Sequence, residues 1–179
     1  SQINMFNTTL SAEQLTQFSD IHTSFIPKRK KRFETYDILY PTSRAADKNK
    51  EVYTRINPIL EKSLSILQSN NITDFDERIY SVEFHQRNCG FEKKKHDWSG
   101  WHKDDHANMH CNVYSILFYL RKDTTVEGGN LEYIENSQKK EHTVKSGDVL
   151  QFKGDMRHKP QATSGFGCRD IIVVFIKRK

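Results

Sequence analysis

The chain has 179 residues, of which 35% are hydrophobic and 28% charged. This size and balance predict one globular domain with a single buried core and argue against a second domain of ordinary size. No apolar run approaches the roughly 20 residues that cross a bilayer, and the opening SQINMFNTTL lacks the pattern of a secretory signal. Cys89, Cys111 and Cys168 form no CxxC pair, which predicts free thiols in a reducing intracellular compartment, cytoplasmic or nuclear.

Basic residues are concentrated in two runs. The formal net charge is +5, and Lys28–Arg32 and Lys93–Lys95 are uninterrupted bases. Such runs attract nucleic acid or an acidic protein segment, act as a nuclear address, or form solvated loops. The sequence leaves these interpretations open.

The N-terminal part of the chain predicts helices around one short strand. Ser11-Ala-Glu-Gln14 fits a capping box, and Leu15 and Phe18 continue at helical spacing, as expected of a first helix. The stretch FETYDILY at 33–40 then predicts a strand.

A second, polar helix is expected from about Ser43 onward. Asn57 followed by Pro58 suits an N-cap with proline at the first helical position, so we expect this helix to stop and restart there. The restarted helix carries one apolar stripe that predicts core packing: Ile59, Leu60, Leu64 and Leu67.

From residue 77 onward, short alternating segments predict strands. RIYSVEFHQ places Tyr80, Val82 and Phe84 on one face, and NVYSILFYL, NLEYI, EHTVK, DVLQF and DIIVVFIK follow between turn-rich pieces. Helices first and strands afterwards predict an α+β fold, with helices covering one sheet of an antiparallel sandwich or barrel. We expect a single domain over 1–179, with helical support in 1–76 and a β core in 77–179.

The stretch WSGWHKDDHANMH at 98–110 offers three sets of metal ligands. His102, His106 and His110 would share one face of a helix, but Asp104 and its neighbours are poor helix formers. The histidines could instead be solvated loop residues. In the third set, His102 and Asp104 point to the same side of an extended segment and combine with a distal His158. Two imidazoles and one carboxylate with open positions suit non-haem Fe(II).

The order of motifs resembles the Fe(II)- and 2-oxoglutarate-dependent dioxygenases, in particular their prolyl 4-hydroxylase-like branch. The resemblance covers about residues 78–178 and depends on these motifs: His102-Lys-Asp104, Leu117-Phe-Tyr119-Leu120, Gly128-Gly129-Asn-Leu131, Ser146-Gly147-Asp148-Val-Leu-Gln-Phe152, His158 and Arg169. It implies a double-stranded β-helix (jelly-roll) core with N-terminal supporting helices.

The resemblance also implies roles for single residues. The expected catalytic iron ligands are His102, Asp104 and His158. Arg169 matches the base that pairs with the distal carboxylate of 2-oxoglutarate, and a lone arginine opening an apolar strand would be costly if buried without an anion. Tyr119 matches a tyrosine that supports this carboxylate, and Leu131 matches an apolar wall. Plain core packing remains the alternative for both.

Two segments depart from the family pattern. The family often has a tyrosine on the strand before the first ligand pair, where this chain reads VEFHQRN, so Phe84 or His85 would stand nearby. The charged segment 87–101 is either a lid over the substrate entrance or a plain surface loop.

The function that the resemblance implies is hydroxylation of a C–H bond. Its cofactors would be Fe(II), 2-oxoglutarate as cosubstrate and dioxygen, and a requirement for ascorbate stays open. The motif order favours a protein or peptide substrate, with a residue such as proline as the target. The alternatives are a nucleic-acid or small-molecule oxygenase, or a non-enzymatic jelly-roll binding module, because a fold does not determine a substrate. No membrane association is expected, and oligomeric state is not readable from the sequence.

Overall fold

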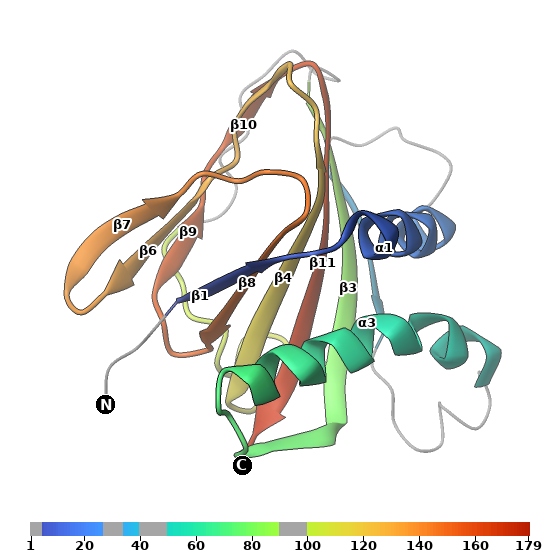
Figure 1. Cartoon of the computed structure of the whole chain (residues 1–179). Coiled ribbons are helices and arrows are strands. Elements are labelled where there is room, and N and C mark those ends of the chain that lie inside the picture. The colour runs from blue at the N-terminus through green and yellow to red at the C-terminus, as the bar shows by residue number, and fades with distance from the viewer. Residues whose placement is uncertain (1–4, 27–33, 40–49, 90–99) are drawn as a thin grey trace.

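The structure, a computed structural model, describes residues 5–26, 34–39, 50–89 and 100–179. Both basic runs, most of the segment 87–101 and the expected helix start near Ser43 lie outside these residues. Within them the chain forms two helices and eleven strands (Figure 1). The helices are α1 (Ala12–Phe25) and α3 (Lys50–Ser69). The strands are β1 (Phe6–Thr9), β2 (Glu34–Leu39), β3 (Phe75–Cys89), β4 (Val113–Lys122), β5 (Val126–Gly128), β6 (Leu131–Glu135), β7 (Gln138–His142), β8 (Asp148–Lys153), β9 (His158–Pro160), β10 (Thr163–Gly165) and β11 (Gly167–Arg178).

The strands form one large sheet and two small ones. The large sheet has the order β1-β8-β4-β11-β3-β2, the second joins β7-β6-β9, and β10 pairs with β5. Every pairing between described strands is antiparallel. Figure 1 shows both helices on one side of the large sheet and the β7-β6-β9 sheet on the other. The expected α+β architecture is confirmed, and β1 is a strand that the sequence pattern did not reveal.

Alternation along the central strands gives the large sheet two different faces. On β4, Ile116 and Phe118 point toward the helices, whereas Leu117 and Tyr119 belong to a separate cluster. That second cluster includes Leu131 of the small sheet. Because successive side chains of a strand point to opposite faces, one set of strands builds two cores.

The first helix begins as the sequence predicts. The hydroxyl of Ser11 accepts a hydrogen bond from the backbone N–H of Gln14, and the side chain of Gln14 accepts one from the N–H of Ser11. This reciprocal pair satisfies two of the four N–H groups that a helix start leaves without partners. The helix then packs Phe18 edge-on against Phe118 of β4, with ring centroids 5.4 Å apart.

The prediction of a helix restart at Pro58 is wrong, because α3 runs through this proline without a break. Proline removes one hydrogen bond and crowds the preceding turn. The apolar face of α3 outweighs this cost, since Ile56 and Ile59, on either side of Pro58, are completely buried. Neither helix in the described part of the chain has the apolar length that a membrane span requires.

Replacing Phe18 by alanine is expected to lower the free energy of unfolding by about 3–5 kcal/mol, because it leaves a cavity between α1 and the sheet. Phe18 is 2% exposed, whereas Phe166 is 66% exposed, so the matched change Phe166→Ala should cost less than about 0.5 kcal/mol. Urea unfolding of both variants measures the difference. Equal losses of stability would contradict this account of the helix-side core.

Candidate metal centre and its cavity

A single backbone contact brings two distant histidines together. His102 and His158 form an isolated antiparallel bridge in which each backbone N–H donates to the other residue's carbonyl at 3.0 Å. Residues paired in this way lie side by side and project to the same face. The imidazole centroids are therefore only 4.3 Å apart.

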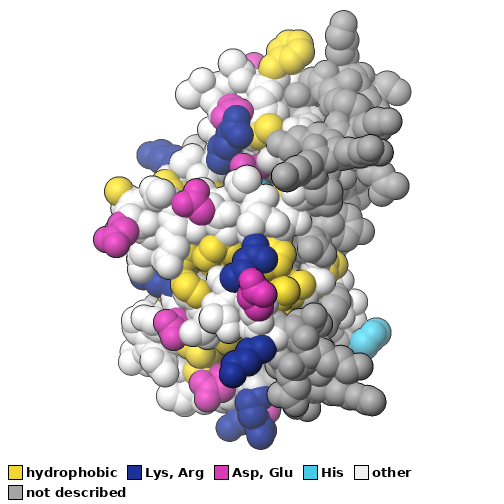
Figure 2. Space-filling model, turned by 90° about the vertical axis from the view of Figure 1, so that its right-hand side faces the viewer, with side chains coloured by type: hydrophobic (Ala, Val, Ile, Leu, Met, Phe, Trp, Pro, Cys, Tyr) yellow, Lys and Arg dark blue, Asp and Glu magenta, His cyan; other side chains and the backbone are white. Residues whose placement is uncertain are grey.

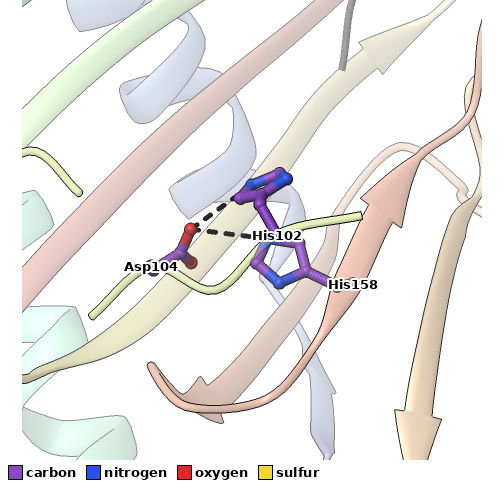
Figure 3. Close-up of side chains that lie close together, drawn as sticks. All are labelled: His102, Asp104 and His158. Atoms are coloured by element: carbon purple, nitrogen blue, oxygen red, sulfur yellow. Dashed lines mark ion pairs between the residues drawn. The ribbon is translucent and has the colours of Figure 1, made fainter. Parts of the chain in front are cut away.

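Asp104 completes the group from the loop that follows His102 (Figure 3). Its backbone N–H donates to the carbonyl of Gly154 at 2.9 Å, and its Oδ2 accepts a hydrogen bond from the hydroxyl of Ser115 at 2.7 Å. The other carboxylate oxygen, Oδ1, lies 3.5 Å from Nε2 of His102 and 3.4 Å from Nε2 of His158. One oxygen is thus anchored while the other faces both imidazoles.

Hydrogen bonds on the far side of each imidazole select the nitrogen that faces this group. Nδ1 of His102 lies 2.9 Å from the carbonyl of Gly100, and Nδ1 of His158 lies 3.1 Å from that of Met156. A carbonyl only accepts, so Nδ1 donates and the neutral ring keeps its lone pair on Nε2. Metal-binding histidines are commonly oriented in this way.

The ligand atoms of His102, Asp104 and His158 all lie within 4.8 Å of one another. Two imidazole nitrogens and one carboxylate oxygen on one side of an ion are a suitable donor set for non-haem Fe(II). A catalytic zinc ion can use a similar set. The three residues therefore fit a divalent transition metal, and the surrounding cavity has to distinguish between the two.

The charges within the group also favour a cation. Burial by itself would raise the pKa of Asp104, but its contacts with His102 and His158 and the hydrogen bond from Ser115 hold it below its ordinary value. The contact with the Asp104 carboxylate raises the pKa of His102, whereas burial lowers that of His158. At neutral pH the carboxylate is therefore ionised, as metal binding requires.

The next residue, Asp105, fastens the ligand loop to the end of β11. Nη1 and Nη2 of Arg178 donate to its two carboxylate oxygens at 2.9 and 3.1 Å, and the backbone N–H of Val113 donates to Oδ1 at 2.9 Å. Gly154 permits this packing, because a Cβ atom there would lie 2.2 Å from Oδ1 of Asp105. No motif in the sequence predicted this clamp.

The other two histidines of the stretch lie away from the group. His106 and His110 are exposed and adopt left-handed backbone conformations, with φ of 59° and 55°. None of residues 102–110 is helical, and residues 105–110 form turns and bends. The ligand set that needed His102, His106 and His110 on one helix face is therefore excluded.

A cavity of about 400 Å³ extends from the three ligands along the inner face of the large sheet. Tyr119 and Arg169 line it, as expected, together with apolar side chains that include Leu117 and Ile171. Leu131 is 1% exposed and belongs to the same apolar cluster as Leu117 and Ile171, but it is not among the cavity-lining residues.

Strand β3 supplies polar cavity residues that the sequence interpretation largely missed. Phe84 faces the helices, whereas Glu83, His85 and Arg87 line the cavity. The carboxylate of Glu83 accepts hydrogen bonds from Nε2 of His85 at 2.8 Å and from Nδ2 of Asn108 at 2.9 Å, and so links β3 to the ligand loop. The alternation of charged and apolar residues in VEFHQRN was the available signal.

Several solved structures described as oxygenases or hydroxylases have similar folds. An oxidoreductase of the 2OG-Fe(II) oxygenase family from Burkholderia pseudomallei superimposes with a TM-score of 0.66 and 10% identity over 98% of this chain and 86% of that chain. A prolyl-4-hydroxylase from Pseudomonas putida superimposes with a TM-score of 0.57 and 12% identity, over 99% of this chain and 94% of that chain. The dioxygenase for auxin oxidation 1 from Arabidopsis thaliana was solved with 2-oxoglutarate. It superimposes with a TM-score of 0.62 and 12% identity, over 98% of this chain and 83% of that chain. The fold is that of the 2OG-Fe(II) oxygenases.

The expected double-stranded β-helix core is thereby confirmed. At the level of sequence alone, no family model and no curated protein matches this chain. Within the oxygenase fold, the bridge between His102 and His158 joins the ligand loop to β9, and the cavity lies between the large sheet and this bridge. The likeness concerns the architecture, so the chemistry has to be argued from the residues themselves.

Replacing Arg178 by glutamine is expected to weaken binding of a divalent metal by about 10- to 100-fold without removing a ligand. The change leaves the carboxylate of Asp105 without its two-point partner and releases the loop that carries Asp104. Calorimetric titration with Mn²⁺ measures the affinity. Arg78→Gln is the matched control, because Arg78 is 85% exposed and its partner is Asp76. Equal Mn²⁺ affinity in the Arg178 variant and the wild type would disprove the clamp.

Proposed function

We propose that this protein is an Fe(II)- and 2-oxoglutarate-dependent dioxygenase that hydroxylates a C–H bond. The observation that carries the proposal is one cavity with a metal-ligand set at one part and a buried arginine at another. The ligand set is His102, Asp104 and His158, and the arginine is Arg169, which is 2% exposed. A metal-bound keto acid with a second carboxylate is complementary to both features.

The metal is assigned by the residues around it. His102, Asp104 and His158 would hold Fe(II) on one side and leave its remaining positions facing the cavity. A hydrolytic zinc site needs one open position and a general base beside it. The cavity also contains the buried guanidinium of Arg169, which suits an anionic cosubstrate and has no part in zinc hydrolysis.

The cosubstrate would be held by complementary charge and by a neutral donor. The planar guanidinium of Arg169 can bind a carboxylate through two parallel hydrogen bonds. Burial raises the pKa of Tyr119 to about 12, although Arg169 and Arg87 both act to lower it. The hydroxyl of Tyr119 therefore keeps its proton at neutral pH and can donate a hydrogen bond to the same carboxylate. Leu131 would stiffen the apolar layer behind these groups.

When bound, Fe(II) and 2-oxoglutarate activate dioxygen so that one oxygen atom enters a C–H bond and the other enters succinate, with release of carbon dioxide. The chain's own residues bind, orient and shield the reactants. Leu117, Ile171, Val173 and Phe175 line the cavity with apolar surface, which limits the access of water. A requirement for ascorbate stays open.

A protein or peptide is the substrate class we favour, with a side chain such as proline as the target. Small-molecule sites span about 300–1,000 Å³, and this cavity of about 400 Å³ has to hold the cosubstrate as well. Only a small reacting group fits beside it, as when one side chain of a polypeptide enters. The similar fold of a prolyl-4-hydroxylase supports the same choice.

A nucleic-acid substrate is the second candidate because of the two basic runs. Binding to nucleic acid without sequence preference depends on a positively charged groove with stacking aromatic residues. On the helix-covered face in Figure 2, the described basic and acidic side chains are intermixed and form no groove of one sign. The observed charge distribution on that face therefore does not favour this candidate.

A reducing intracellular compartment suits this chemistry. Cys111 is a free thiol whose side chain is partly exposed. Free thiols persist where the glutathione and thioredoxin systems keep them reduced, and a cytoplasmic or nuclear location would meet this condition.

Anaerobic addition of Fe(II) and then 2-oxoglutarate to the metal-free protein is expected to produce a visible metal-to-ligand charge-transfer band. The band requires the keto acid to chelate the metal, so His158→Ala should abolish it while the far-ultraviolet circular dichroism stays unchanged. Absorption spectroscopy in an anaerobic cuvette measures it. A folded wild type without a band would overturn the proposed function and favour a binding module.

Substrate class is tested by coupled turnover. Release of succinate from 2-oxoglutarate should increase several-fold with a library of proline-containing peptides and should not increase with single-stranded oligonucleotides. Mass spectrometry should then find peptides heavier by one oxygen atom. Stimulation by oligonucleotides alone would replace the peptide assignment with the nucleic-acid one and leave the reaction type standing.

A further inference from the structure

The cavity contains a second arginine that is placed directly beside the first. Arg87 of β3 and Arg169 of β11 are register partners in the antiparallel pairing of these strands. Side chains that are directly opposite in such a pair start about 4.5–5.5 Å apart at Cβ and point to the same face of the sheet. Both residues line the cavity that contains the metal-ligand set.

Both arginines are buried to an unusual degree for charged residues. Arg87 is 1% exposed and Arg169 is 2% exposed. Two guanidinium groups placed side by side in one cavity can both donate hydrogen bonds to a single carboxylate that enters it.

Other contacts place Arg87 at the same part of the cavity as the expected cosubstrate carboxylate. Arg87 and Arg169 both act on the hydroxyl of Tyr119, whose pKa each of them lowers against the effect of burial. Nη1 of Arg87 also donates to the carbonyl of Gln161 at 3.4 Å, which steadies the guanidinium against the segment between β9 and β10.

We propose that Arg87 is a second cosubstrate-binding residue, and that Arg87 and Arg169 together hold the carboxylate of 2-oxoglutarate remote from the metal. This inference rests on the proposed function and adds a residue of β3 to which the resemblance assigns no role. Two guanidinium groups select a ligand with a distal anionic group much more strongly than one. The site therefore discriminates dicarboxylic from monocarboxylic 2-oxo acids.

The alternative is that Arg87 only stabilises β3 and has no contact with the cosubstrate. The two roles differ in their dependence on the ligand. A structural arginine would affect all keto acids alike, whereas a carboxylate-binding arginine affects only a keto acid that carries the distal carboxylate. 2-Oxopentanoate is the matched probe, because it has the chain length of 2-oxoglutarate with a methyl group in place of that carboxylate.

The test is calorimetric titration of 2-oxoglutarate and of 2-oxopentanoate into the Mn²⁺-loaded protein. Arg87→Gln is expected to weaken 2-oxoglutarate binding by about 10- to 100-fold, the usual effect of losing a charge-assisted hydrogen bond. Its affinity for 2-oxopentanoate should stay within about threefold of the wild type. Arg87→Lys should recover part of the loss, since it restores the charge without the planar fork. Arg55→Gln is the matched control on the helix side, where Arg55 is exposed and stacks on Phe25.

Each outcome separates the two proposals. Unchanged 2-oxoglutarate affinity in Arg87→Gln, or equal weakening of both keto acids, overturns the role of Arg87 and leaves the proposed function intact. A wild type that binds Mn²⁺ but neither keto acid overturns the proposed function and this inference together. If Arg87→Gln does not fold, the Arg87→Lys variant is used in its place. A loss of affinity for 2-oxoglutarate that exceeds the loss for 2-oxopentanoate then supports the role of Arg87, and equal losses overturn it.

Discussion

The antiparallel bridge between His102 and His158 is the contact on which the rest of the site depends. Two backbone hydrogen bonds of 3.0 Å set the spacing and the common direction of the two imidazoles. The hydrogen bonds of both Nδ1 atoms to backbone carbonyls then orient Nε2 toward Asp104. Because these constraints come from the backbone, the ligand geometry exists before any metal binds, which lowers the conformational cost of binding.

The large sheet separates stability from chemistry by the alternation of its side chains. One face of β4 and β11 packs against α1 and α3 and forms a largely apolar core. The other face carries the cavity, with the anionic Asp104 at the metal-ligand group and the cationic Arg87 and Arg169 elsewhere along it. Such a cavity is polarised, so it would orient a ligand that presents a metal-chelating group and a distal anion. The helix-side core supplies the rigidity that this arrangement needs.

Much of the fold and part of the site were predictable from local pattern. The capping box at Ser11, the alternation in β4 and the spacing of His102 and Asp104 are local signals, and each describes the structure correctly. The stop at Pro58 was predicted wrongly, because local rules for proline do not include the burial of the face on which it lies. The clamp between Asp105 and Arg178 joins residues 73 positions apart, and no periodicity reveals such a pair.

The sequence by itself determined the fold class, the separation of helices from strands, and the residue types able to bind a metal and a carboxylate. These properties follow from spacing and side-chain chemistry, which are local. Only the tertiary structure decided which residues share one cavity: it placed Arg87 opposite Arg169 and left Leu131 out of the cavity lining. The physical reason is strand register, since shifting a strand by one residue moves every side chain to the other face and changes its neighbours.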